Sequence, residues 1–457
     1  MKLQDIPVRA DETSAEQSLY EVRRKIYPRA VHGAFAWLRW AAVWATQLVF
    51  YGGAWLTWND RQAILFDIVH RKFYLFGLVF WPQDVIYLTV LLIIAAFSLF
   101  LFTAVAGRIW CGYACPQTVY TEIFMWIERK VEGDRNARMR LDEQGWNAEK
   151  IFRKSAKHAL WVALALWTGF TFVGYVTPIR ELWAEVWSLS TGPWETFWIL
   201  FYGFATYGNA GWMREQVCKY MCPYARFQSA MFDKDTLIIT YDERRGEPRG
   251  KGAAKGDCVD CGICVQACPT GIDIREGLQY ECIGCAACID GCDQVMDKLG
   301  RSRGLIRYST THAMEGTPTK LLRPRVVVYT FILAAIAAAA AFSLYVRVPL
   351  KLDVIRDRAA LSREVEGGLI ENIYRLQVMN TAEEPRAFAL SVSGLPGIQL
   401  AEEPTIGVGA ATSRVVPVKV RVPMDAVKPG AHKIEFELRA LGREDIKVEE
   451  HSVFIVR

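Results

Sequence analysis

Long apolar runs alternate along the chain with strongly polar stretches. Five runs approach the ~20 residues that a helix needs to cross a bilayer, and they cover positions 40–58, 84–106, 160–176, 194–212 and 326–346. Several begin or end at Trp or Tyr, which collect at membrane–water interfaces. One such run would also fit a buried helix of a soluble protein, but five together predict a five-helix transmembrane bundle.

After the fifth run the pattern changes to short alternations of apolar and polar residues. This period of two is typical of half-buried strands, and it recurs at positions 373–380, 387–392, 414–422, 433–439 and 448–456. Short strands separated by glycine- and proline-containing turns predict a C-terminal immunoglobulin-like β-sandwich. Because this tail has no cysteine, we expect it to serve docking or structure rather than catalysis.

Composition and charge support a membrane protein with soluble parts. The 457 residues are 52% hydrophobic with a net charge of +5, which excludes a disordered, collagen-like or coiled-coil chain. Lys and Arg gather before the first run, between the second and third, and after the fourth. The positive-inside rule therefore places the N-terminus in the cytoplasm and the tail outside. The basic stretch 129–140 is interpreted as a solvated helix beside anionic lipid, so the bilayer and not nucleic acid is the expected partner.

All 12 cysteines lie between Cys111 and Cys292, within the two segments expected to be cytoplasmic. A reducing compartment keeps thiols free of disulfides, so metal ligation is the favoured role. The external loops and the tail, where disulfides would form, contain no cysteine.

Eight of the cysteines form two runs with the spacing C-x2-C-x2-C-x3-C. This is the bacterial two-cluster ferredoxin pattern, in which the fourth cysteine of each run crosses to the other cluster. It predicts two [4Fe–4S] clusters, one held by Cys258, Cys261, Cys264 and Cys292, and the other by Cys268, Cys282, Cys285 and Cys288. A pair of structural zinc sites is the alternative, disfavoured by two identical runs. In the second run the last cysteine is followed by Asp293, whereas the pattern has a proline at that position.

The other four cysteines form two C-x3-C-P motifs, each just after an even-numbered apolar run: Cys111 with Cys115, and Cys218 with Cys222. Paired sulfurs suit Cu(I) or Zn²⁺, or a redox-active dithiol, and Met221 offers a thioether. The proline makes part of each motif a turn. The alternative is that all four are buried thiols that pack the ends of the spans.

These assignments divide the chain into six parts. We predict a cytoplasmic arm at 1–39, a transmembrane core at 40–249, a two-cluster ferredoxin domain at 250–300, a linker at 301–325, a fifth transmembrane helix at 326–346 and the sandwich at 347–457.

The order of motifs closely resembles the cytochrome c oxidase accessory proteins called CcoG, FixG or RdxA, which are polyferredoxin-like membrane proteins. The matching residues read R-Q-A-I-L-F-D-I and F-W-P-Q-D, then W-C-G-Y-A-C-P-Q-T, then C-K-Y-M-C-P-Y-A-R-F-Q-S-A-M-F-D, then the two ferredoxin runs. Quinol-dehydrogenase-like subunits share the C-x3-C-P and ferredoxin plan but are less similar in the first external loop.

The resemblance implies an oxidoreductase of the bacterial inner membrane, with a periplasmic sandwich, that reduces Cu(II) to Cu(I) for a cbb(3)-type cytochrome oxidase. It implies a catalytic copper site at Cys111, Cys115, Cys218 and Cys222, copper-delivery or oxidase-assembly proteins as partners, and an unidentified electron donor. Two alternatives stay open: a quinol-linked electron-transfer subunit, and a non-catalytic assembly scaffold with redox-sensing clusters. A homodimer also stays open.

Overall fold

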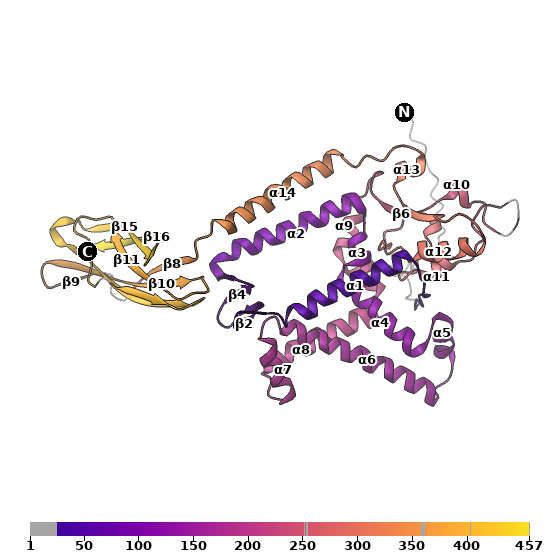
Figure 1. Cartoon of the computed structure of the whole chain (residues 1–457), viewed down its shortest axis with the longest axis horizontal. Coiled ribbons are helices and arrows are strands. Elements are labelled where there is room, and N and C mark those ends of the chain that lie inside the picture. Colours follow the sequence, from indigo (N-terminus) through magenta and orange to yellow (C-terminus); the bar gives the residue numbers. More distant parts are fainter. Residues whose placement is uncertain (1–24, 251, 253–254, 358–361, 403, 457) are drawn as a thin grey trace, which may run out of the picture.

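A β-sandwich and a cysteine-rich region stand at opposite ends of the molecule, and long helices run between them (Figure 1). The structure is a computed structural model that describes residues 25–250, 252, 255–357, 362–402 and 404–456. Positions 1–24 of the predicted N-terminal arm lie outside these residues.

Three helices in the described part of the chain are long and apolar enough to cross a membrane. They are α2 (Val85–Ala106, preceded by the 3-10 turn η1, Pro82–Asp84), α6 (Ala148–Val173) and α14 (Pro324–Tyr345). These correspond to the second, third and fifth predicted spans. The other two predicted spans also form helices, with different limits.

The limits of the first predicted span need correction. The first helix, α1, covers Ala34–Gly53, so it begins six positions before the prediction, and Thr57–Trp58 already belong to a short strand, β1. The fourth predicted span, 194–212, is matched by α8 (Pro193–Thr206) and the π-helical segment η2 (Tyr207–Met213) that continues it. The region of the first span is rich in Trp and Tyr, whose amphipathic rings give less clear span limits than aliphatic residues do.

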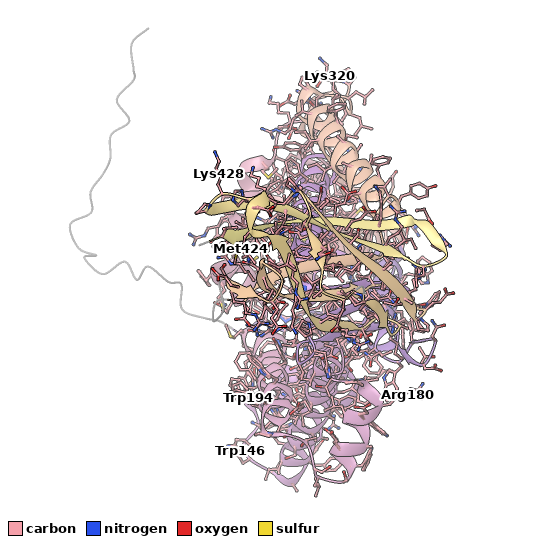
Figure 2. The ribbon with its side chains drawn as sticks, turned by 90° about the vertical axis from the view of Figure 1, so that its left-hand side faces the viewer. Trp146, Arg180, Trp194, Lys320, Met424 and Lys428 are labelled. Carbon is pink, nitrogen blue, oxygen red and sulfur yellow. The ribbon has the colours of Figure 1, made fainter. Side chains whose placement is uncertain are left out.

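Two groups of helices form the middle of the molecule. In one, α2 lies beside α14, where the Tyr87 hydroxyl is 3.0 Å from Ser343 Oγ. In the other, α6 crosses α8 so closely that a Cβ added at Gly169 would lie 2.3 Å from the Ile199 carbonyl oxygen. Figure 2 looks along the long axis from the sandwich end, with Lys320 near one extreme and Trp146 near the other.

The predicted basic helix at 129–140 is more buried than a solvated helix would be. It consists of the end of α4 (Pro116–Glu132) and most of α5 (Arg135–Glu143). The Arg138 side chain is only 2% exposed and lies 2.9 Å from the buried Glu128 carboxylate, which also binds Arg214 at 3.1 Å. Part of this charge therefore forms an internal ion network instead of facing lipid.

The C-terminal tail forms two antiparallel sheets packed face to face. The first sheet contains β12 (Gln399–Leu400), β14 (Ser413–Pro423), β10 (Leu369–Asn380) and β8 (Leu350–Arg356), with β9 (Arg363–Val365) also paired to β10. The second contains β13 (Thr405–Val408), β11 (Arg386–Ser393), β15 (Gly430–Ala440) and β16 (Arg443–Val456). All five predicted strands lie within these elements, which confirms the sandwich.

The segment between α1 and α2 forms small antiparallel strands that contact the sandwich. Its hairpin pairs β1 with β2 (Arg61–Gln62), and its sheet contains β3 (Ile64–Asp67), β4 (Lys72–Leu75) and β5 (Leu78–Phe80). The Glu383 carboxylate on the sandwich accepts hydrogen bonds from Arg61 at 2.6 Å and Asn59 at 2.7 Å. The loop thus connects the helices to the sandwich.

The cysteine-rich region is closed by a strand pair that the sequence did not predict. Strands β6 (Ile238–Tyr241) and β7 (Ile306–Ser309) pair in antiparallel fashion on either side of the two cysteine runs. Between them lie α10 (Glu243–Gly246), α11 (Ile263–Ala267), the 3-10 turn η4 (Ile274–Glu276) and α12 (Ala287–Lys298). The unit is therefore longer than positions 250–300, and α13 (Thr311–Glu315) occupies part of the predicted linker.

Candidate functional site

The two cysteine runs repeat one backbone conformation. In each run the residues before and after the second cysteine have positive φ angles: 52° at Asp260 and 63° at Gly262, then 68° at Gly284 and 58° at Ala286. Such left-handed residues reverse the chain sharply, so three thiols face inward before a short helix begins. This explains why glycine stands at one of the two positions in each run.

The first set of predicted cluster ligands surrounds one cavity. Its walls include Cys258, Cys261, Cys264 and Cys292, so the last cysteine of the second run joins three of the first. Apolar side chains complete the lining, among them Met296, Leu305 and Ile306. Cys261 is exposed, whereas the other three thiols of this set are buried.

The second set surrounds a neighbouring cavity. Its walls include Cys268, Cys282, Cys285 and Cys288, together with four isoleucines and Cys264 from the first set. The two cavities therefore share a wall at Cys264. This is the crossed arrangement of ligands that the spacing predicts.

The donor set of each cavity fits a [4Fe–4S] cluster. Among the described residues, no three His, Cys, Asp or Glu side chains are grouped to hold a single metal ion. Four thiols spread around an apolar space suit a cubane, in which each iron takes one thiolate, better than a tetrahedral zinc ion. Burial raises the pKa of Cys264 to about 11 and of Cys292 to about 12, so cluster insertion has to release protons.

Both C-x3-C-P motifs have the same local design. The first cysteine lies in a short helical segment, Cys111 in α3 (Ile109–Tyr113) and Cys218 in the π-helical η3 (Val217–Met221). The second is the N-cap of a following helix, Cys115 for α4 and Cys222 for α9 (Pro223–Met231). Proline is favoured at the first helical position because it needs no hydrogen bond there. The break between the cysteines is the turn that the sequence predicted.

The structure places the four C-x3-C-P cysteines near one another, without grouping three of them around a single metal position. Cys218 is close enough to Cys115 and Cys222 for their charges to interact, and Cys111 stands in the same relation to Cys115 and Cys218. Burial raises the pKa of both Cys111 and Cys218 to about 12. We call these four residues the thiol quartet.

The thiol quartet lies directly against the second cysteine run. Cys111 and Cys218 pack with Cys285 and Ile283. A Cβ added at Gly112 would lie 2.7 Å from the Gly284 carbonyl oxygen and 3.0 Å from Cys285 Cα. Glycine is therefore required for this contact between the quartet segment and the second cluster cavity.

Two residues of the site could not be recognised from the sequence. The buried Arg108 donates hydrogen bonds to the carbonyl oxygens of Cys282 (3.1 Å), Tyr280 and Ala225, so it joins α2, α9 and the second run. The buried Gln228 accepts a hydrogen bond from Cys111 Sγ at 3.3 Å. Their position beside the motifs was the available signal. Met221, by contrast, has a side chain that is 57% exposed.

Family models match three parts of the chain. A 4Fe–4S dicluster domain matches residues 213–311 and a 4Fe–4S binding domain matches residues 88–132. The model for the IG-like fold at the C-terminus of FixG matches residues 340–457. The iron–sulfur nature of the chain and its sandwich are thereby confirmed.

Two relatives match most of the chain with about 40% sequence identity. The nitrogen fixation protein FixG of Rhizobium meliloti (strain 1021) is 38% identical, over 95% of this chain and 93% of that protein. The protein RdxA of Cereibacter sphaeroides is 40% identical, over 86% of this chain and 87% of that protein. A solved FixG-related protein of Vibrio parahaemolyticus is 28% identical with a TM-score of 0.21, over 23% of this chain and 95% of that one.

Proposed function

The chain belongs to the FixG/RdxA family, and on that premise we propose that it is a cupric reductase that supplies Cu(I) during assembly of a cbb(3)-type cytochrome oxidase. The observation that carries the proposal is the contact between the thiol quartet and the second cysteine run. One set of thiols fits an electron carrier, and the other offers soft ligands beside it.

The cluster cysteines and the thiol quartet would have separate roles. Cys258, Cys261, Cys264 and Cys292 would hold one [4Fe–4S] cluster, and Cys268, Cys282, Cys285 and Cys288 the other. Such clusters supply single electrons when bound, and reduction of Cu(II) to Cu(I) consumes one. Two thiolates of the quartet would bind the product, because thiolate sulfurs prefer Cu(I), and Met221 would offer a thioether near the surface.

Charge and shape support an orientation across the inner membrane. The cysteine region and the sandwich lie at opposite ends of the long helices (Figure 1), and Lys and Arg gather in the segments beside the cysteines. We propose that the cysteine region is cytoplasmic and the sandwich periplasmic, and that α1 and α8 enter the membrane together with α2, α6 and α14. The sandwich would then be available to copper-delivery or oxidase-assembly proteins.

The test is anaerobic reduction of Cu(II) by the purified full chain. The protein is reduced with dithionite, freed of excess reductant and mixed with Cu(II), and Cu(I) is followed with a chromogenic chelator. We expect the variant C111S/C218S to react at least about tenfold more slowly, the usual scale for loss of a metal-site partner, with unchanged iron content. Equal rates in the two proteins would refute a role for the quartet.

Metal analysis of the same samples separates the proposal from a third iron–sulfur site. The 4Fe–4S binding-domain match includes Cys111 and Cys115, so iron bound by the quartet is the competing assignment. Two clusters predict about eight irons per chain, and the number should be the same in C111S/C218S. A loss of about four irons in that variant would assign the quartet to iron instead of copper.

A further inference from the structure

A large cavity lies where the start of α1, α4 and the cysteine region meet. Its volume is about 830 Å³, within the usual range of ~300–1,000 Å³ for small-molecule and cofactor sites. The proposed function assigns no ligand to it. Its walls contain tryptophans, charged side chains and two of the cysteines.

Four tryptophans form part of the cavity wall. Trp37, Trp40 and Trp44 come from α1 and Trp126 from α4, and the rings of Trp40 and Trp126 are 6.2 Å apart between centroids. Trp37 is 70% exposed and Trp44 is 63% exposed. Exposed tryptophans are typical of the interface between a membrane protein and lipid, so this part of the wall suits contact with a lipid-like tail.

Other parts of the wall are polar, and the wall includes one thiol of each set. Arg39 donates a hydrogen bond to the Cys285 carbonyl oxygen at 2.6 Å, and Glu122 is close enough to Arg39 for their charges to interact. The cavity wall also contains the buried Glu215, together with Cys285 and Cys218. The same cavity is therefore lined by a member of the second cluster set and a member of the quartet.

We propose that this cavity binds a membrane hydroquinone, which is the electron donor of the protein. The ligand has to be amphipathic, with a tail that leaves through the tryptophans and a polar ring that hydrogen-bonds to Arg39 and Glu122. Oxidation of one hydroquinone to the quinone releases two protons and two electrons. The protons pass to Glu122 and Glu215. Each four-cysteine site can take one of the two electrons once that site holds its cluster.

The inference rests on the proposed function, because it names the donor for the same thiol sites. It can nevertheless fail alone. If dithionite-reduced protein reduces Cu(II) but the cavity takes no quinone, the cupric reductase stands and the donor is another molecule.

The experiment measures binding of decylubiquinone to the full-length protein in phosphatidylcholine nanodiscs, by quenching of tryptophan fluorescence. We expect one saturable site, and we expect both Trp126→Ala and Glu122→Gln to weaken the affinity at least tenfold. Trp146→Ala and Glu143→Gln are the matched controls, because these exposed residues lie outside the cavity, and they should bind like the wild type.

Photolabelling with an azidoquinone provides a second readout that does not depend on variant stability. Labelled peptides should come from 34–44 and from 117–130. The proposal is overturned by non-saturable quenching, by equal weakening in variants and controls, or by label that is confined to other segments. It is also overturned if phosphatidylglycerol displaces the quinone stoichiometrically, which would make the cavity a lipid site.

Discussion

At the residue scale, Gly112 decides how closely the quartet approaches the second cluster cavity. A methyl group there would overlap the backbone at Gly284, and forcing atoms into a packed contact costs ~1–3 kcal/mol. We therefore expect Gly112→Ala to lower the thermal stability of the purified protein and to slow Cu(II) reduction with unchanged iron content. Gly52→Ala is the control, since nothing lies within 4 Å of its added Cβ; equal behaviour of the two variants would contradict the contact.

Glu128 is the second residue whose role can be measured alone. It is buried between Arg138 and Arg214, and removing one member of a buried ion network leaves uncompensated charge at a cost of ~3–5 kcal/mol. Glu128→Gln should therefore cause a clear decrease in the unfolding temperature of the protein in detergent. Glu149→Gln removes an exposed pair with Arg153, which is worth ~0–1 kcal/mol. Similar shifts for both would show that the Glu128 network adds little.

At the element scale, the crossing of α6 and α8 depends on one small residue. Gly169 on α6 meets the backbone of α8 at Ile199 and Gly203, and small residues allow membrane helices to approach this closely. Gly169→Val should separate the helices and reduce the yield of folded, monodisperse protein in size-exclusion chromatography. Ala163→Val changes an exposed position of the same helix and should be neutral; if both variants elute alike, the crossing is not a determinant of folding.

The elements that the sequence predicted well are those with an unbroken period. Strands β14 and β15 alternate more and less buried positions over many residues. Helices α2 and α14 are long and almost wholly apolar although almost none of their length is buried inside the protein, so length and composition alone identify them. Elements whose formation depends on residues elsewhere in the chain were not predicted. β7 exists because it pairs with β6 from a segment about 65 residues away, and the short strands β9 and β12 are too brief to show a period.

The candidate site follows the same rule. The eight cluster cysteines could be sorted into two sets because thiol spacing reflects a cubane directly, and the structure gathers the same sets. The contact between the quartet and the second set could not be predicted, since it depends on Arg108 and on the absence of a side chain at Gly112. The cavity beside α1 was equally invisible, because its walls come from distant segments.

At the scale of the whole molecule, the segment between α1 and α2 joins the helices to the sandwich. Glu383 is the centre of this contact, with hydrogen bonds from Arg61, Asn59 and Trp58. We expect Glu383→Ala to increase hydrogen exchange in the loop strands and at the facing edge of the sandwich, while the sandwich core stays protected. The neighbouring Glu384 is exposed, so Glu384→Ala should leave exchange unchanged; identical exchange in both variants would exclude Glu383 as the link.

The long axis of the molecule also makes the proposed orientation testable. Single cysteines placed in the tail, which has none of its own, should react with a membrane-impermeant maleimide in intact spheroplasts. Labelling of the tail only after lysis would place the sandwich on the cytoplasmic side and contradict the orientation.

The central claim is that electrons stored at the paired ferredoxin runs reduce copper at the adjacent quartet. The most direct measurement is anaerobic electron paramagnetic resonance, in which Cu(II) is added stepwise to the reduced full-length protein. The account predicts that each Cu(II) added loses its signal while the signal of one reduced cluster disappears, up to about two Cu(II) per chain. In C111S/C218S the Cu(II) signal and the reduced-cluster signal should both remain. Persistence of the Cu(II) signal beside reduced clusters in the wild type would contradict it.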